Sequence, residues 1–596
     1  MSARGMRRWA EAGSAVVLAV ALVLTALPAK GAGGYEDRLV EWGLAQVGRE
    51  REPSPEGKRI EEILVESEEI IAPTDPYPSI VNIIHVKTKD SVVRREVLLG
   101  VGEPYQAAKA EESERNLRRL GVLAISKVVP VKGKTPDGVA LLVVTKDLWS
   151  IRLNQDFNFA SGVVQRYRLR PTEQNFLGLN KQLGLDLYLK IDTLAIGQSY
   201  GDPRLFGTRL QLTESADIIF NRHTHLPEGS FGSLNFGLPL YSLDAENGFN
   251  VGGSWVVQRA RVFRGPTLWL LPYPDATEPT GTVPYVYDDR ELAAGASYSR
   301  SFGHYYKTNV TLGVGGFTKR FAPPAEEALP QEQVDWLTAR YLPQSEDATY
   351  LYGALRAYEA RYRVLRNLRT FALSEDYQLG YNVLFQARWA DPVFLSPKRF
   401  VEMGGSARYR WLFGDDMLTA TAAAAARYVP DATGTGLDGP WVNKRIAAEV
   451  ENFSPVLGVG RFVFRGLVDL HFDDLNNRVV LLGSGNGLRG VAAESLSGTH
   501  LMLLNFEYRT LPIEILTLHA GAVVFWDVGS AFSRGPQPVH TVGIGFRFLF
   551  PQLDVEPFRV DFGYVINAQN PPFWDHVSSS FGQVDDYRPT FLDTPL

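Results

Sequence analysis

Strict alternation between apolar and polar residues near the C-terminus constrains the fold more than any other feature. In 501–509 the even positions are apolar, whereas the odd positions include Asn505 and Glu507. In 523–529 the apolar positions leave Asp527 on the face that would also carry Glu507. A period of two is typical of a β-strand whose two faces meet different surroundings. These stretches therefore predict a sheet with one apolar face and one charged face.

The same alternation continues downstream and decides between two architectures. One-sided sheets occur in soluble sandwiches, which bury their apolar faces, and in membrane barrels, whose outer faces meet lipid. The stretches 542–550 and 558–564 repeat an apolar row opposite glycine, arginine and aspartate. Because strand after strand offers the same apolar face, lipid is the simpler partner. We predict a transmembrane barrel with a charged interior.

The first 32 residues have the three parts of a secretory signal peptide. Arg4, Arg7 and Arg8 form a positive end, 15–27 is largely apolar, and 29–31 offers small residues for cleavage. The alternative is a membrane-anchoring helix, for which the apolar stretch is short. No other stretch is long enough for a membrane helix. Lipid offers no hydrogen-bond partner, so every backbone N–H and C=O group in a membrane must pair within the protein. An exported chain that remains in a membrane without helices must therefore form a closed barrel.

Composition and motifs exclude several functional classes. The 596 residues include no cysteine, which rules out disulfides and thiolate metal or redox sites, and a net charge of −6 gives no signature of nucleic-acid binding. The chain has no Gly-x-Ser-x-Gly elbow, no His-Glu-x-x-His and no P-loop. We expect no enzyme, no metal site and no cofactor. A barrel lipase with scattered Ser, His and Asn remains a less favoured alternative.

The segment before the barrel divides into a spacer and a small domain. We expect 33–78 to be a spacer with a short helix at 35–46, and 79–149 to be a compact α+β domain. Its elements follow the order β-α-α-β-β. They are expected at 80–88, 91–99, 107–120, 122–131 and 139–145.

Residues 150–596 are expected to form the barrel. Roughly sixteen to eighteen alternating segments can be counted there, and an even number is typical of bacterial barrels. The longest non-periodic stretches, 275–285 and 323–347, are interpreted as extracellular loops. The last strand is expected at 577–584. Its serine-rich sequence offers little side-chain packing and would suit a weak closing seam, although it could equally be a simple poor strand.

Three stretches of the small domain resemble a known module. They are Gly-Glu-Pro-Tyr at 102–105, Glu-Arg-Asn-Leu-Arg at 114–118 and Thr-Lys-Asp-Leu-Trp-Ser at 145–150. With the order of its elements, the domain resembles a POTRA domain, the periplasmic module that precedes the barrel in the BamA/TamA (bacterial surface antigen) family. The resemblance implies about sixteen strands and an inward-folded loop, which would lie around 476–499.

The candidate loop carries a glycine-flanked arginine. The sequence Gly487, Leu488, Arg489 and Gly490 resembles the Arg-Gly motif at the tip of the family's inward-folded loop. The usual form has an aromatic residue next, where this chain has Val491. A second departure lies at the C-terminus, because the family usually ends on an aromatic residue that closes the last strand.

A second motif offers a partner for this arginine. The stretch 525–529 resembles the family's Phe-x-Asp-x-Gly strand, and the resemblance implies that Arg489 binds Asp527, with Glu507 as a second candidate acceptor. A guanidinium suits this contact because its planar fork holds a carboxylate at two points. The alternative is a solvated arginine in a surface loop and an unrelated aspartate.

The resemblance implies an outer-membrane protein that assists insertion or translocation of other polypeptides. Its small domain would lie in the periplasm. Its partners would be unfolded client polypeptides, outer-membrane lipid and accessory lipoproteins. The alternative function is a polypeptide secretion pore, or a passive channel that uses the small domain for docking.

Overall fold

The computed structural model describes most of the chain from Tyr35 onward. The described residues are 35–71, 82, 85–160, 163–264, 266–274, 281–325, 329–430, 439–492, 494–553, 556–567, 577–581 and 591. The predicted signal peptide at 1–32 lies outside the described residues, as does the tail at 585–596 apart from Phe591. Among the described helices, none combines the length and the apolar character that crossing a membrane requires.

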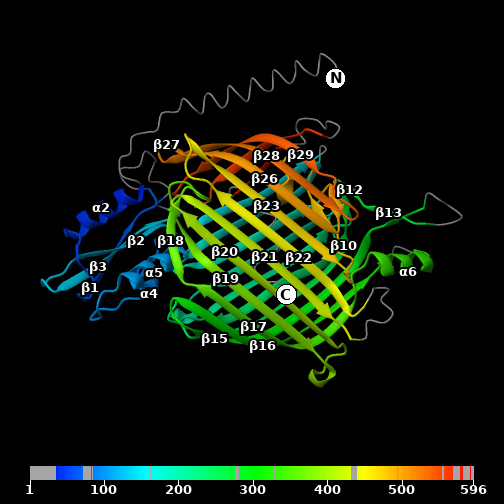
Figure 1. Ribbon diagram of the computed structural model, residues 1–596, viewed down its shortest axis with the longest axis horizontal. Coiled ribbons are helices and arrows are strands. Elements are labelled where there is room, and N and C mark those ends of the chain that lie inside the picture. The colour runs from blue at the N-terminus through cyan, green and yellow to red at the C-terminus, as the bar shows by residue number, and fades with distance from the viewer. Residues whose placement is uncertain are drawn as a thin grey trace, which may run out of the picture.

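Antiparallel strands form one closed barrel, which dominates the molecule (Figure 1). Eighteen of its strands are uninterrupted: β4 (Ile151–Ala160), β5 (Val163–Phe176), β6 (Lys181–Lys190), β7 (Thr193–Asp202), β8 (Gln211–Asn221), β9 (Pro227–Leu238), β10 (Asn247–Arg261), β15 (Val286–Phe302), β16 (Tyr306–Ala322), β19 (Ser374–Ala390), β20 (Phe400–Phe413), β21 (Asp416–Tyr428), β22 (Trp441–Phe453), β23 (Gly460–Phe472), β28 (Leu518–Phe532), β29 (Val539–Leu549), β30 (Phe558–Val565) and β31 (Val577–Phe581). The other two strands are interrupted. β18 (Arg361–Arg366) continues β17 (Glu346–Glu359) along β19, and β27 (Ile513–Ile515) continues β26 (His500–Thr510) along β28.

The fold class is confirmed, but the expected number of about sixteen strands is too low. The described residues form twenty strands, an even number. The undercount has a physical reason, because some strands lack a contrast between their faces. β21 carries alanine on both faces over 422–426, and β9 is rich in glycine and serine.

The two faces of the C-terminal strands point as the alternation predicts. Phe506, Trp526 and Phe546 point outward and are 37%, 43% and 41% exposed, whereas Asn505 and Asp527 point inward and are 2% and 0% exposed. A closed barrel that exposes an apolar outer surface has paired its backbone and presents to its surroundings the face that lipid favours. The molecule is therefore a transmembrane barrel of the outer-membrane type.

The N-terminal domain has the expected order β-α-α-β-β, but its first strand lies earlier in the chain. Its elements are β1 (Arg59–Glu68), α4 (Asp90–Glu96), α5 (Ala107–Arg118), β2 (Leu123–Lys132) and β3 (Gly138–Asp147). In the sheet, β3 lies between β1 and β2, parallel to β1 and antiparallel to β2. The strand predicted at 80–88 is wrong, since 85–88 forms none and 59–68, assigned to the spacer, takes its place.

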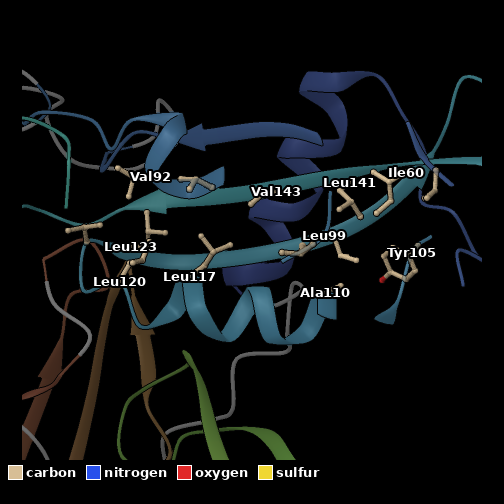
Figure 2. Packing of buried hydrophobic residues seen from close by; sticks show 14 residues of the cluster. Ile60, Val92, Leu99, Tyr105, Ala110, Leu117, Leu120, Leu123, Leu141 and Val143 are labelled. Carbon is tan, nitrogen blue, oxygen red and sulfur yellow. The ribbon is translucent and has the colours of Figure 1, made fainter. Parts of the chain in front are cut away.

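Helices cover both faces of this sheet. On one face, α4 and α5 pack over a core that includes Val92, Leu117 and Leu141, all buried (Figure 2). On the other face lies α2 (Tyr35–Val47), the helix expected at 35–46, which contributes Leu39 to a second core. That core also includes Phe371, Leu373 and Leu549 of the barrel. The helix α2 therefore fills the space between the sheet and one rim of the barrel.

The N-terminal domain contacts several turns of that rim. Arg118 of α5 holds the carboxylate of Asp376 with two hydrogen bonds of 2.7 Å. Glu96 of α4 forms ion pairs with Arg204 and Arg209 in the turn between β7 and β8. These contacts reach different parts of the rim, so the domain is docked across the barrel mouth and is not joined to the barrel by the connecting segment alone.

A buried carboxylate joins α2 to the same rim. Glu36 is 3% exposed, and its carboxylate accepts hydrogen bonds from the backbone N–H and the hydroxyl of Ser374 and forms ion pairs with Lys127 and Arg366. Burial alone would raise the pKa of Glu36, but these cationic and hydroxyl partners outweigh it and lower the pKa below its ordinary value of 4.5.

Docking of α2 should therefore weaken in acid. Because the pKa of Glu36 is lowered on folding, its contribution is present above pH 4.5 and is lost as the pH falls through the lowered value. Glu36→Gln should remove this pH dependence and weaken docking by about 2 kcal/mol, since the charge-assisted hydrogen bonds are lost. Hydrogen-exchange protection of α2 measures both effects. Glu41→Gln, at an exposed position of the same helix, is the control; equal effects of the two variants would contradict the assignment.

The far end of the barrel carries a second cluster of structure. It comprises β11 (Phe263–Arg264), β12 (Thr267–Leu268), β13 (Leu270–Pro272), β14 (Thr282–Pro284) and α6 (Gln331–Arg340). Figure 1 shows α6 and β13 at the end opposite the N-terminal domain. The two stretches expected to be loops, 275–285 and 323–347, thus include short elements in their described parts, and Tyr285, Leu337 and Leu342 share a small core there.

Candidate functional site

A long connection between β23 and β26 enters the barrel. We call residues 473–499 the inward loop; it contains the paired strands β24 (Val480–Leu482) and β25 (Leu496–Gly498) and the 3-10 turn η4 (Ser484–Asn486). Leu488 is fully buried and packs in one cluster with Leu501 and Leu503, which are inward-facing residues of β26. The expected loop around 476–499 therefore lies against the inner wall of the barrel.

Arg489 lies at the tip of the inward loop and binds two carboxylates of the wall. Its Nε donates to Asp527 Oδ2 at 2.8 Å and its Nη2 donates to Asp527 Oδ1 at 2.7 Å, which is the two-point contact of a guanidinium fork. Its Nη1 lies 2.7 Å from Glu507 Oε1. The side chains of all three residues are at most 1% exposed. The structure thus brings together the three charged residues that the motifs single out.

Neutral groups complete the surroundings of this contact. Asn505 Nδ2 donates to Asp527 Oδ1 at 2.8 Å and to the carbonyl oxygen of Gly487 at 2.9 Å, so it joins the loop backbone to the wall. The guanidinium of Arg489 also lies over the ring of Phe525, 3.7 Å from its centroid. A cation packed on an aromatic face and held by two carboxylates is fixed in position as well as neutralised.

Glycines allow the loop to approach the wall this closely. Gly490 has a φ of +83°, in the left-handed region that glycine favours. A Cβ on Gly563 of β30 would lie 2.6 Å from the N and Cα atoms of Gly490, so the two backbones touch. A Cβ on Gly529 would lie 3.0 Å from both Cδ atoms of Leu488. Val491 is buried at the place where the resemblance leads one to expect an aromatic residue.

Further charges extend the cluster, and the motifs alone did not identify them as part of the site. Arg509 Nε contacts Glu507 Oε2, and Arg547 Nη1 lies 2.7 Å from Asp561 Oδ1. Their positions could have been found from the alternation, which places Arg509 on the inward face of β26 and places Arg547 and Asp561 on the inward faces of β29 and β30. Among the described residues, the charged members of this cluster are Arg489, Arg509, Arg547, Arg559, Glu507, Asp527 and Asp561.

This arrangement can hold a loop but offers no evident chemistry. Each carboxylate of the cluster faces a guanidinium, so none is presented as a base or nucleophile. Within the described part of the chain, no group of three or more His, Cys, Asp or Glu residues could hold a metal ion. The geometry is that of a latch, in which one arginine joins the loop to β26 and β28.

Comparisons with known proteins assign no family. The chain matches no family model and no curated protein. Among solved structures it is similar to CdiB from Escherichia coli, with a TM-score of 0.43 and 11% identity over 88% of this chain and 76% of that chain. BamA from Haemophilus ducreyi lacking POTRA domains 1-3 gives 0.32 and 12% over 88% and 84%, and the FrpB iron transporter from Neisseria meningitidis gives 0.36 and 9% over 76% and 86%. Similarity at this level carries no argument about function, which has to be inferred from the molecule itself.

Proposed function

We propose that this chain is an outer-membrane protein that assists the insertion or translocation of other polypeptides. It acts without enzymatic chemistry and without a cofactor. Its N-terminal domain is a single POTRA-like module on the periplasmic side. Its partners are unfolded outer-membrane or secreted polypeptides and the lipid around the barrel, and accessory lipoproteins are further candidates.

The observation that carries the proposal is the weak closure of the barrel. Among the residues that the structure describes, β31 and β4 share two paired positions, Ser578 with Asn158 and Ser579 with Phe157. On the two sides of this seam, β30 pairs with β31 over 558–562 and β4 pairs with β5 over 151–160. A seam held by few backbone hydrogen bonds can open at modest cost and expose two strand edges, which template the pairing of an incoming strand.

The N-terminal sheet offers a second place for an extended client. β1 is an outer strand of this sheet, and near Ile60 its edge is hydrogen-bonded to the turn at 102–105. The carbonyl oxygen of Ile63 accepts a hydrogen bond from Arg94, and the part of the edge beyond it, towards Glu68, is where we propose that a client strand pairs. Pairing through backbone groups tolerates many sequences, which suits a protein that handles different clients.

Locking the seam tests this function directly. The chain has no cysteine, so Phe157→Cys combined with Ser579→Cys introduces its only two thiols at paired positions. The Cα atoms of antiparallel partners are about 4.5–5.5 Å apart, within the range that a disulfide spans. In vesicles that contain the oxidised variant, the folding rate of a urea-unfolded eight-stranded test barrel should fall to that seen in empty vesicles, and reduction should restore it.

A matched lock elsewhere in the wall is the control. Leu504 and Val528 are paired positions of β26 and β28, away from the seam, and a disulfide between cysteines there should leave the folding rate unchanged. If the seam lock leaves the rate at its unlocked value, the chain is not an insertase of this kind.

The alternative is a secretion pore or a passive channel. It is favoured by a polar cavity of about 410 Å³ inside the barrel, lined by residues of β15, β16, β17, β19 and β20. A channel would conduct ions in planar bilayers equally well with the seam locked or open. An insertase would lose client folding under the same lock, so the two measurements separate the functions.

A further inference from the structure

One residue of the C-terminal segment lies inside the barrel. Phe591 comes ten positions after Phe581, the last residue of β31, and only 4% of it is exposed. The guanidinium carbon of Arg445 in β22 lies 4.3 Å from the centroid of its ring. Ile446, the next residue of β22, is 50% exposed on the outer face, so Arg445 points into the lumen. Phe591 therefore packs against the lumenal wall.

A carboxylate of the neighbouring strand fixes the orientation of this arginine. Asp469 of β23 accepts hydrogen bonds of 2.8 Å from Nε and 2.6 Å from Nη2 of Arg445. This two-point contact uses the edge of the guanidinium group, so the ring of Phe591 can pack on it without competing for these N–H groups. A cation that is held against an aromatic face away from water is attracted more strongly than an exposed one.

Small side chains beside Arg445 make room for the ring. Ala423 of β21 is directly paired with Ala447 of β22, and both belong to the apolar cluster that contains Phe591. They are 4% and 0% exposed. A side chain as short as alanine is buried this deeply on a lumenal wall only where another segment covers it. In this cluster Phe591 and the inward loop provide the cover.

The same cluster joins Phe591 to the inward loop. Leu482 and Leu488 of the loop and Leu467 of β23 belong to it and are at most 1% exposed. The latch fixes the loop to β26 and β28, whereas this cluster extends from the loop to β21, β22 and β23. Phe591 thus packs where the loop meets a part of the wall that the latch does not reach.

We propose that this part of the lumenal wall is a binding site for an aromatic side chain, and that the chain's own Phe591 docks there and holds the inward loop in place. An aromatic ring suits the site because it can be buried among apolar side chains while its face meets the guanidinium of Arg445. An aliphatic side chain would fill the apolar cluster but would leave the cation without this contact. The site depends neither on the seam nor on a client, so it goes beyond the proposed assembly function.

Substitutions of Phe591 in the full-length protein test this docking. Phe591→Ala should make cleavage of the inward loop by added protease about tenfold faster or more, because a buried ring is lost, and conductance in planar bilayers should rise. Phe591→Leu keeps an apolar side chain without the aromatic face, so its cleavage rate should lie between those of Phe591→Ala and the wild type. Phe385→Ala is the control: it removes a ring that is 50% exposed on the outer face of β19 and should change neither measurement.

A free peptide distinguishes a binding site from a fixed packing contact. A peptide with the sequence of 585–596 is added on both sides of a bilayer that contains the Phe591→Ala protein. The peptide supplies the missing ring, so it should lower the conductance towards the wild-type value. The same peptide carrying the Phe591→Ala substitution should leave the conductance raised.

Three results would overturn the site: unchanged cleavage and conductance in Phe591→Ala, an equal effect of Phe385→Ala, or the same effect of both peptides, including none. Folding of each variant is checked by gel migration that changes only on boiling. Should Phe591→Ala fail this check, Phe591→Leu replaces it in both experiments. Wild-type cleavage in Phe591→Leu would also count against the site, because the contact with Arg445 requires an aromatic face.

Discussion

Arg489→Ala is expected to release the inward loop from the barrel wall. The substitution removes the fork on Asp527 and the contact with Glu507, and it leaves two carboxylates buried beside each other. Removing one partner of a buried ion pair costs about 3 to 5 kcal/mol, because the remaining charge is neither solvated nor compensated. We expect this range for the latch, since its three charged side chains are at most 1% exposed.

Two measurements report the release. Cleavage of the inward loop by added protease should become faster, and the conductance of purified protein in planar bilayers should rise as the loop leaves the lumen. Arg489→Lys should restore the loop only partly, because an ammonium lacks the planar fork. In a double-mutant cycle, Asp527→Ala should cost much less in the Arg489→Ala background than in the wild type, because the two residues share one contact.

An exposed ion pair provides the control for this experiment. Arg320 and Asp347 form an ion pair at the far end of the barrel, with side chains 54% and 36% exposed. Arg320→Ala should leave loop cleavage and conductance at wild-type values. If Arg489→Ala also leaves both unchanged, the loop is held by its apolar contacts and the arginine is not a latch.

The alternation of residues was sufficient to predict which side chains face the lumen. In β26 and β28 it assigns Asn505, Glu507 and Asp527 to one face, and the structure buries all three. The alternation follows from the geometry of a single strand, so it can be recognised without knowing which strands pair with it. The contact between Arg489 and Asp527 was a different kind of inference, because it came from a resemblance to family motifs rather than from spacing.

The close approach of the loop to β30 could not be predicted in this way. Gly490 and Gly563 are 73 positions apart in the sequence, and neither shows that its backbone touches the other. The same holds for Arg547 and Asp561, whose pairing depends on the register between β29 and β30. Register is set by the assembled barrel, so residue types alone do not determine which inward charges meet.

The misplaced first strand of the N-terminal domain has a similar explanation. β1 has the sequence RIEEILVESE, whose four glutamates interrupt the apolar residues and weaken the strand pattern. The stretch at 80–88 is richer in β-branched residues and looked more like a strand. Tertiary pairing with β3 outweighs this local propensity, because β3 is buried along its full length and needs a partner on that side.

Gly563→Ala is expected to displace the loop tip without touching any charge. The added Cβ would lie 2.6 Å from the N and Cα atoms of Gly490 and 2.9 Å from the carbonyl carbon of Arg489. These are backbone atoms, so no rotation of a side chain relieves the clash and the loop has to move. Overpacking of this kind costs about 1 to 3 kcal/mol, and the shift also pulls Arg489 away from Asp527.

A graded series of glycine substitutions makes this expectation specific. Gly529→Ala would meet only the methyl ends of Leu488 and Leu482, which can rotate away, so it should accelerate loop cleavage less than Gly563→Ala. Gly353→Ala, in another strand of the wall, places its Cβ 4.0 Å from the nearest atom and should have no effect. Protease cleavage of the loop should therefore rank Gly563→Ala fastest and Gly353→Ala equal to the wild type. A loop that rests on β30 cannot accommodate the added methyl group. If the loop is cleaved no faster in Gly563→Ala than in Gly353→Ala, the loop therefore does not rest on β30.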